Sequence, residues 1–143
     1  MQGHAMLEWS CQEERFNRIS DWALWIIRSK LLGAPQLITI EGYAMGAKGL
    51  VFNIAENTGL LKHKLWNANY KFCTPAPSAI KKFATTKGNA NKEKMQESFI
   101  EQTGVDIKKA LAMTESAWNP SSDIIDSYYM MRWSEARFNE DNK

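Results

Sequence analysis

The spacing of apolar residues in the first third of the chain is typical of a helix. A helix is expected to begin at Ser10, whose hydroxyl and the carboxylate of Glu13 would form a capping box. Gly33 and Pro35 follow the periodic stretch and are expected to end it. The apolar stripe of this helix would consist of Phe16, Ile19, Ala23, Ile26 and Ile27.

The next elements alternate between strand-like and helix-like patterns. The β-branched run before Glu41 predicts a short buried strand, and Tyr70–Thr74 predicts a second one. Between them, residues 50–66 have helical spacing, despite one internal glycine. The residues expected to point inward from this helix are Leu50, Ile54, Leu61 and Leu65.

The second half of the chain is predicted to be mostly helical. Short helices are expected around residues 80–84 and 106–112, and a longer one carries Met95, Phe99 and Ile100 up to Gly104. A last helix begins near Asp123. Residues 139–143, the sequence NEDNK, are expected to form a frayed polar tail.

Composition indicates one globular α/β domain over residues 1–143. A chain of 143 residues with 44% hydrophobic content can build one core, and it contains no apolar run of membrane-spanning length. No signal-peptide pattern is present, so a cytoplasmic location and no membrane partner are expected. The beginning, MQGHAM, is similar to the remnant of a cleaved affinity tag, so residues 1–9 are expected to be disordered or vector-derived.

Cysteine and histidine are too few for the metal and nucleophile chemistry that depends on them. Cys11 and Cys73 are isolated and are expected to be reduced thiols. His4 and His63 alone offer little material for a zinc site or a catalytic triad.

The stretch SSDIIDSYYM, which opens the last helix, carries two carboxylates one turn apart. Asp123 and Asp126 share a helix face, and the helix dipole accounts for an acid in the first turn better at Asp123 than at Asp126. Apolar residues cover most of the circumference, so a largely buried helix is expected, whose acids need a cation or hydrogen bonds. With Glu41 at a strand end, these side chains make a set of hard oxygen ligands for Mg²⁺ or Mn²⁺.

Charge is distributed unevenly along the chain, although the net charge is only +2. Residues 78–95 contain five lysines and one glutamate, whereas residues 115–143 contain six acids and three basic residues. The basic stretch is expected to face a polyanion beside the acidic site, with a solvated surface as the alternative. Its lysines are Lys81, Lys82, Lys87, Lys92 and Lys94.

Three segments, taken in order, resemble RuvC-type Holliday junction resolvases, most of all the phage-encoded branch. They are ITIEGYAMGAKGLVFNIAENTGLLKHKLW, IKKFATTKGNANKEKM and SSDIIDSYYMMRW, and the likeness extends over roughly Glu13–Arg137. The resemblance implies an RNase H-like α/β fold, a mixed sheet flanked by helices. It also implies a homodimer that nicks four-way or otherwise branched DNA with magnesium, inside a bacterial host cell if the protein is phage-encoded.

The resemblance also implies residue roles. Glu41, Asp123 and Asp126 would be the metal ligands and, with Lys92, the catalytic residues. Tyr43 lies near the place of an aromatic residue that inserts at the junction centre, although Ala44 competes for that place. The DNA-binding residues would be Lys81, Lys82, Lys87, Lys92, Lys48 and Tyr43.

One part of the family pattern has no counterpart. Family members begin with an aspartate-bearing strand and a hairpin, whereas this chain begins just before the first helix, with Glu8 as the acid nearest to a possible strand. An N-terminally truncated resolvase is therefore expected, and only two strands are predicted where an ordinary sheet has about four to six. Three alternatives follow: an active nuclease, a junction-binding or dimerising remnant with impaired catalysis, or a module for protein contacts whose acids are helix caps.

Overall fold

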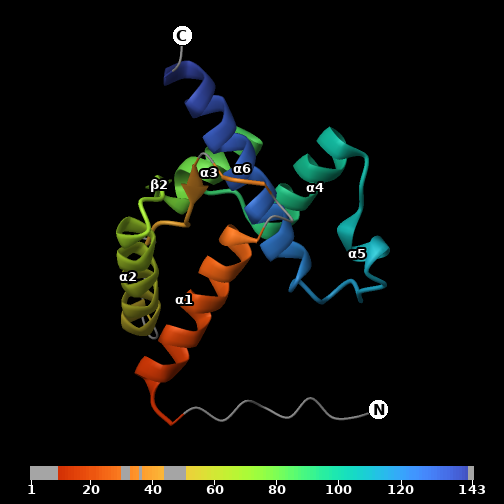
Figure 1. Ribbon diagram of the computed structural model, residues 1–143. Helices are drawn as coiled ribbons and strands as arrows, with labels where there is room; N and C mark the ends of the chain where they lie inside the picture. The colour runs from red at the N-terminus through yellow and green to blue at the C-terminus, as the bar shows by residue number, and fades with distance from the viewer. Residues whose placement is uncertain (1–9, 30–32, 36, 44–50, 142–143) are drawn as a thin grey trace. The chain divides into compact units, whose positions relative to one another are not determined.

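The computed structural model describes residues 10–29, 33–35, 37–43 and 51–141, and this part is mostly helical (Figure 1). The chain divides into two compact units. The first comprises Met1–Ile38 and Gly46–Phe72, and the second comprises Thr39–Met45 and Cys73–Lys143. In the described part, no helix is both long enough and apolar enough to cross a membrane.

The first unit contains two 17-residue helices in contact, α1 (Gln12–Arg28) and α2 (Val51–Asn67). The buried face of α1 repeats every four residues, at Phe16, Ser20 and Leu24. The predicted stripe was therefore partly wrong, because Ser20 is fully buried while Ile19 is 37% exposed. The Ser20 hydroxyl donates to the Phe16 carbonyl at 2.8 Å, so a small polar side chain is satisfied within its own helix.

The start of α1 also differs from the prediction. Cys11, rather than Ser10, occupies the N-cap position and makes no side-chain cap hydrogen bond. Both the backbone N–H and the hydroxyl of Ser10 donate to the Glu14 carboxylate instead, so the predicted capping box with Glu13 is wrong. These hydrogen bonds lower the pKa of Glu14.

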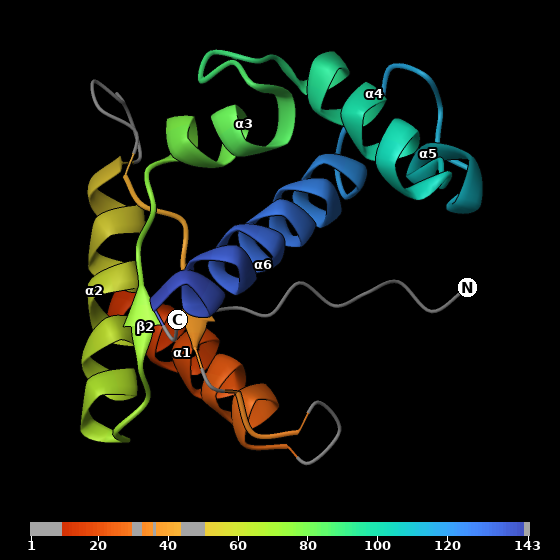
Figure 2. The ribbon, with the colours of Figure 1, turned by 90° about the horizontal axis from the view of Figure 1, so that it is seen from above.

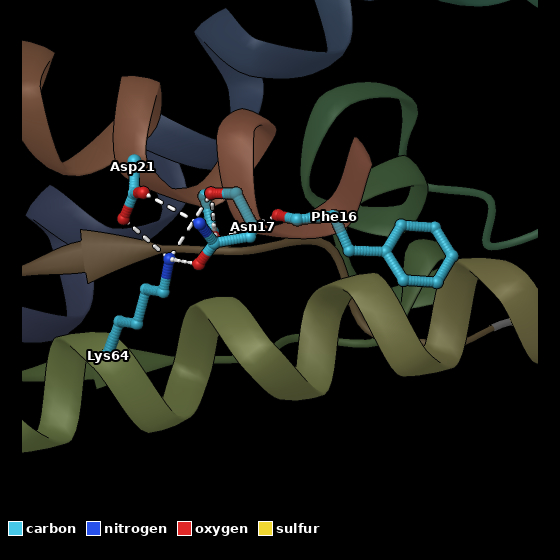
Figure 3. A network of polar contacts seen from close by, with 5 residues as sticks. Phe16, Asn17, Asp21 and Lys64 are labelled. Atoms are coloured by element: carbon cyan, nitrogen blue, oxygen red, sulfur yellow. Dashed lines mark hydrogen bonds and ion pairs between the residues drawn. The ribbon is translucent and has the colours of Figure 1, made fainter. Parts of the chain in front are cut away.

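The second helix has bounds close to those predicted, with Leu65 completely buried. Ile54 was expected to point inward but is 58% exposed. A polar network joins α2 to α1, in which the Lys64 ammonium donates to Asn17 Oδ1 at 2.6 Å and pairs with Asp21 (Figure 3). The ammonium also donates to the Asn17 backbone carbonyl at 3.2 Å.

Two short strands, β1 (Ile38–Thr39) and β2 (Phe72–Cys73), form a two-stranded parallel sheet where strands were predicted. Successive backbone hydrogen bonds run from Ile38 N to Lys71 O, from Ile40 N to Cys73 O and from Gly42 N to Pro75 O, at 2.9, 3.0 and 2.8 Å. Each partner advances by two residues, which is the parallel pattern. The pairing therefore extends one residue beyond Glu41.

The second unit is built on three helices in mutual contact: α3 (Pro77–Thr85), α4 (Lys92–Thr103) and α6 (Ser121–Asp141) (Figures 1 and 2). A four-residue helix, α5 (Ile107–Ala110), lies between α4 and α6 in the chain. In the core, the Phe99 ring meets the Tyr128 ring edge-on, with centroids 5.1 Å apart. The buried core residues are Ile80, Ala84, Ala90, Met95, Phe99, Ile125 and Tyr129.

Helix ends in this unit follow local signals. Asn91 caps α4 by accepting from Lys94 N at 2.9 Å, and Gly104 ends it with a φ of 71°. The last helix is longer than predicted, since it begins at Ser121 and includes the first three residues of the expected polar tail. It is also less buried than predicted, because Ile124 is 38% and Met131 54% exposed.

Candidate functional site

A pocket of about 230 Å³ in the second unit brings together residues far apart in the sequence. Acidic, basic, polar and apolar side chains all contribute to its wall. The lining residues are Glu41, Pro77, Lys81, Asn91, Lys92, Met95, Trp118, Ser122, Ile125 and Asp126.

Strand pairing positions the first acid. Glu41 lies between Ile40 and Gly42, whose backbone N–H groups donate to Cys73 and Pro75 of the neighbouring segment. A Cβ at Gly42 would lie only 2.7 Å from the Pro75 carbonyl oxygen, so the close approach of the two segments depends on glycine. The backbone of Glu41 is thereby fixed on both sides.

The start of α6 positions the second acid. Ser122 N donates to the Trp118 carbonyl at 2.7 Å, and Ile124 N donates to the Pro120 carbonyl at 3.1 Å. Asp126 follows one turn later and is half-buried, whereas Asp123 is exposed and does not line the pocket. Two of the three predicted ligands therefore share the pocket, and the third lies outside its lining.

Burial and neighbouring negative charge destabilise the ionised form of the two carboxylates in the pocket. Partial burial raises the pKa of Glu41 above its ordinary value, and the charge of Asp126 raises it further, against the opposing effect of Lys81. Partial burial likewise raises the pKa of Asp126, with Lys81 opposing it most strongly. Asp123 raises the pKa of both groups, so all three acids lie within electrostatic reach of one another.

This arrangement fits a hard divalent cation. Mg²⁺ is commonly held by one or two carboxylates together with water and substrate oxygens, and Glu41 and Asp126 supply that donor type. A cation would also relieve the repulsion between them. Within the described ranges, no group of three or more His, Cys, Asp or Glu side chains is arranged so that it could hold a metal ion.

The predicted basic residues divide into two sets. Lys81, on α3, and Lys92, the first residue of α4, line the pocket. Lys82 and Lys87 are exposed and do not line it, and Tyr43 is 42% exposed. The remaining predicted DNA-binding residue, Lys48, lies outside the described residues, as do Ala44 and Glu8.

Sequence reasoning missed Trp118 as a wall of the pocket and Lys108 beside it. The Lys108 ammonium lies 3.6 Å from the centroid of the Trp118 ring and donates to the Glu115 carbonyl at 2.6 Å. A tryptophan in the polar run before Pro120 was the available signal, because an aromatic residue in a polar connecting segment suggests a role beyond the core.

No protein-family model and no curated protein matches this sequence. Among solved structures, the chain is similar to the Thermus thermophilus RuvC structure, with a TM-score of 0.62 and 17% identity. The match covers 97% of this chain and 79% of that chain. The chain has a RuvC-like fold. The likeness predicted from three short segments is therefore confirmed at the level of the fold.

Proposed function

We propose that this protein is a structure-selective endodeoxyribonuclease that depends on Mg²⁺, or Mn²⁺, and resolves four-way or otherwise branched DNA. The observation that carries the proposal is the convergence of Glu41 and Asp126 with Lys81 and Lys92 on one pocket. The RuvC-like fold supports it. The finer fold assignment, an RNase H-like mixed sheet flanked by helices, belongs to the same proposal.

The acids and lysines have different tasks in the proposed reaction. Glu41 and Asp126 would hold the cation, with Asp123 adding negative charge nearby. The bound cation would supply Lewis-acid polarisation of the phosphate and activation of water. Lys81 and Lys92 orient the phosphodiester and stabilise the negative charge that develops on its oxygens. The apolar side chains of the wall restrict water and so strengthen these interactions.

The surface lysines have a positioning role in the proposal. Lys82 and Lys87 are exposed on and after α3 and would contact the DNA backbone. Tyr43, two residues beyond Glu41, would contact bases at the branch point. Lys48 belongs to the same proposed DNA-binding set.

A homodimer is part of the proposed function, because paired nicks in a four-way junction require two active sites. Large apolar side chains on the first unit are strongly exposed, as at a protein interface. They are Trp22, Trp25, Phe52, Ile54 and Trp66, with exposed fractions of 64, 63, 78, 58 and 68%. Phe52→Asp is expected to shift the sedimentation equilibrium toward monomer. An unchanged mass at every concentration would count against Phe52 as part of the dimer contact.

A second candidate function is a junction-binding protein that does not cut. It is favoured by the absence, within the described residues, of a cluster of three ligands for a metal ion. The Lys81 and Lys92 side chains would still hold a phosphate in that case.

Cleavage of an end-labelled four-way junction tests the proposal directly. The protein is incubated with Mg²⁺ or with EDTA, alongside a linear duplex of equal length, and Glu41→Gln serves as the matched variant. The proposal expects paired, magnesium-dependent nicks near the branch point, lost in Glu41→Gln while binding persists. Junction binding without cutting by folded protein would favour the second candidate. If the folded protein neither binds nor cuts the junction, both candidate functions are refuted, and a module for protein contacts remains.

A further inference from the structure

Lys108 is a buried lysine whose partners join it to the candidate site. It is 5% exposed, and burying a charge is costly unless hydrogen bonds or charges compensate. Its ammonium donates to the Glu115 carbonyl at 2.6 Å and lies 3.6 Å from the centre of the Trp118 ring. Among aromatic side chains, tryptophan offers the best ring for a cation–π contact.

The segment between α5 and α6 is held at both ends by these contacts. The Lys108 carbonyl accepts from Met113 N at 2.9 Å, and its side chain reaches forward to Glu115 and Trp118. The Trp118 carbonyl in turn accepts from Ser122 N in the first turn of α6. The indole is therefore fixed by Lys108, while the Trp118 backbone is fixed to the helix that carries Asp126.

Trp118 is one of the residues that line the pocket, together with Glu41, Asp126, Lys81 and Lys92. A pocket of about 230 Å³ is too small for a base-paired duplex. It has room for a phosphate and part of one nucleotide. Aromatic faces bind unstacked bases of any sequence.

We propose that Lys108 is a positioning residue that holds Trp118 as a stacking platform for one unstacked nucleotide beside the phosphate bound in the pocket. The platform makes the site selective for phosphates next to an unpaired or splayed nucleotide, as occurs at branch points. This inference rests on the proposed function and specifies the local substrate structure that it requires.

The positioning role can be tested without DNA. The chain contains six tryptophans, and Trp118→Phe identifies the Trp118 indole N–H signal in a ¹H–¹⁵N spectrum. Lys108→Met is expected to move or broaden that signal, while Lys108→Arg keeps it near its original position because a guanidinium also stacks on aromatic rings. Lys109→Met is the matched control, because the Lys109 side chain is 84% exposed and pairs with Asp106. An unmoved Trp118 signal in Lys108→Met would overturn the positioning role.

The platform role is tested by binding in EDTA, with 2-aminopurine placed at the branch point of a four-way junction. Trp118→Leu is expected to weaken junction binding by about 5- to 150-fold, the usual range for one lost stacking contact, and to abolish quenching of the probe. Affinity for a linear duplex stays unchanged. Lys108→Met gives a partial loss that Lys108→Arg restores.

The outcomes separate this inference from the proposed function. If the unmodified protein binds the junction and Trp118→Leu binds and quenches equally well, the platform is refuted while the proposed function stands. If the unmodified protein does not bind the junction, the proposed function fails and the platform falls with it.

Discussion

Gly42→Ala is the substitution whose effect the structure specifies most sharply. The added Cβ would lie 2.7 Å from the Pro75 carbonyl oxygen and 3.1 Å from that of Thr74, both rigid backbone atoms. Ordinary carbon–oxygen contacts lie at about 3.3–3.6 Å, so the segments must separate by roughly 0.6–0.9 Å. That movement breaks or stretches the 2.8 Å hydrogen bond from Gly42 N to Pro75 O.

The expected cost combines a strained contact with a weakened hydrogen bond. Overpacking costs about 1–3 kcal/mol and a hydrogen bond about 0.5–1.5 kcal/mol, so the free energy of unfolding should fall by about 1.5–4.5 kcal/mol. Because Glu41 immediately precedes Gly42, its carboxylate should also shift by nearly 1 Å. A displacement of that size can reduce the proposed cleavage rate by about 100-fold.

Urea unfolding followed by circular dichroism measures the first effect, and junction cleavage measures the second. The matched control is Gly59→Ala within α2, where an added Cβ meets nothing within 4 Å. That variant should gain about 0.5–1 kcal/mol from the higher helix propensity of alanine. A Gly42→Ala protein within about 0.5 kcal/mol of the unmodified one would refute the reasoning, since substitutions away from tight contacts typically stay in that range.

Three further predictions concern charges. The raised pKa of Asp126 means that the folded state binds its proton more tightly than the unfolded state, so stability falls as pH rises from the ordinary carboxylate range through the raised pKa. Asp126→Asn should therefore raise the urea midpoint at pH 7 and lose that advantage at pH 3. Mg²⁺ at 100 times its Kd should stabilise the unmodified protein by about 2.7 kcal/mol and the Asp126→Asn variant by less. An equal gain in both proteins would contradict metal binding at Asp126. Lys64→Met should cost about 1–2 kcal/mol of unfolding free energy, because its side chain is only 18% exposed and its ammonium bridges α2 to Asp21 and Asn17 of α1. An unchanged urea midpoint would show that the network contributes nothing. If about five lysines contact phosphates, junction affinity should fall with salt at a log–log slope near −4 to −5, and replacing Lys82 and Lys87 by methionine should reduce the slope by about 2; a flat salt response would rule out the basic surface.

Local patterns were sufficient to predict the order and type of the elements, but not their buried faces. The bounds of α2 and α4 follow from helical periodicity and from caps such as Asn91 and Gly104. Burial depends on what packs against a helix, which is why Ser20 lies inside and Ile54 outside. A hydroxyl that bonds to its own helix needs no distant partner, so hydropathy alone misplaces it.

The sequence was sufficient to predict those residues of the candidate site that lie near the ends of strands and helices. Glu41 follows a strand and Asp126 lies early in a helix, so strand and helix geometry alone identify both as candidate metal ligands. Trp118 lies in a connecting segment, and Lys108 lies in the four-residue helix α5, where no acid of the described part forms a salt bridge with it. Their proximity depends on the path of the segment between α5 and α6, and Lys108 is compensated by a carbonyl and a ring rather than by an acid that a charge pattern would reveal.

The pairing of β1 with β2 has a consequence for the order of folding. Glu41 and Asp126 are 85 residues apart in the sequence, and closing a loop of that length costs roughly 4 kcal/mol of chain entropy. The Gly42–Pro75 pairing along β2 spans 33 residues, and the contacts of α3 with α6 span at least 36, so each can form without the other. Glu41 and Asp126 share the pocket only after both sets of contacts have formed. The acidic pocket would then be completed late, and a chain that had folded only its C-terminal helices would hold lysines and Asp126 but lack half of its carboxylate pair. If the proposed metal site is real, metal affinity would in that case report on complete folding, and a partly folded chain would lack the proposed nuclease activity.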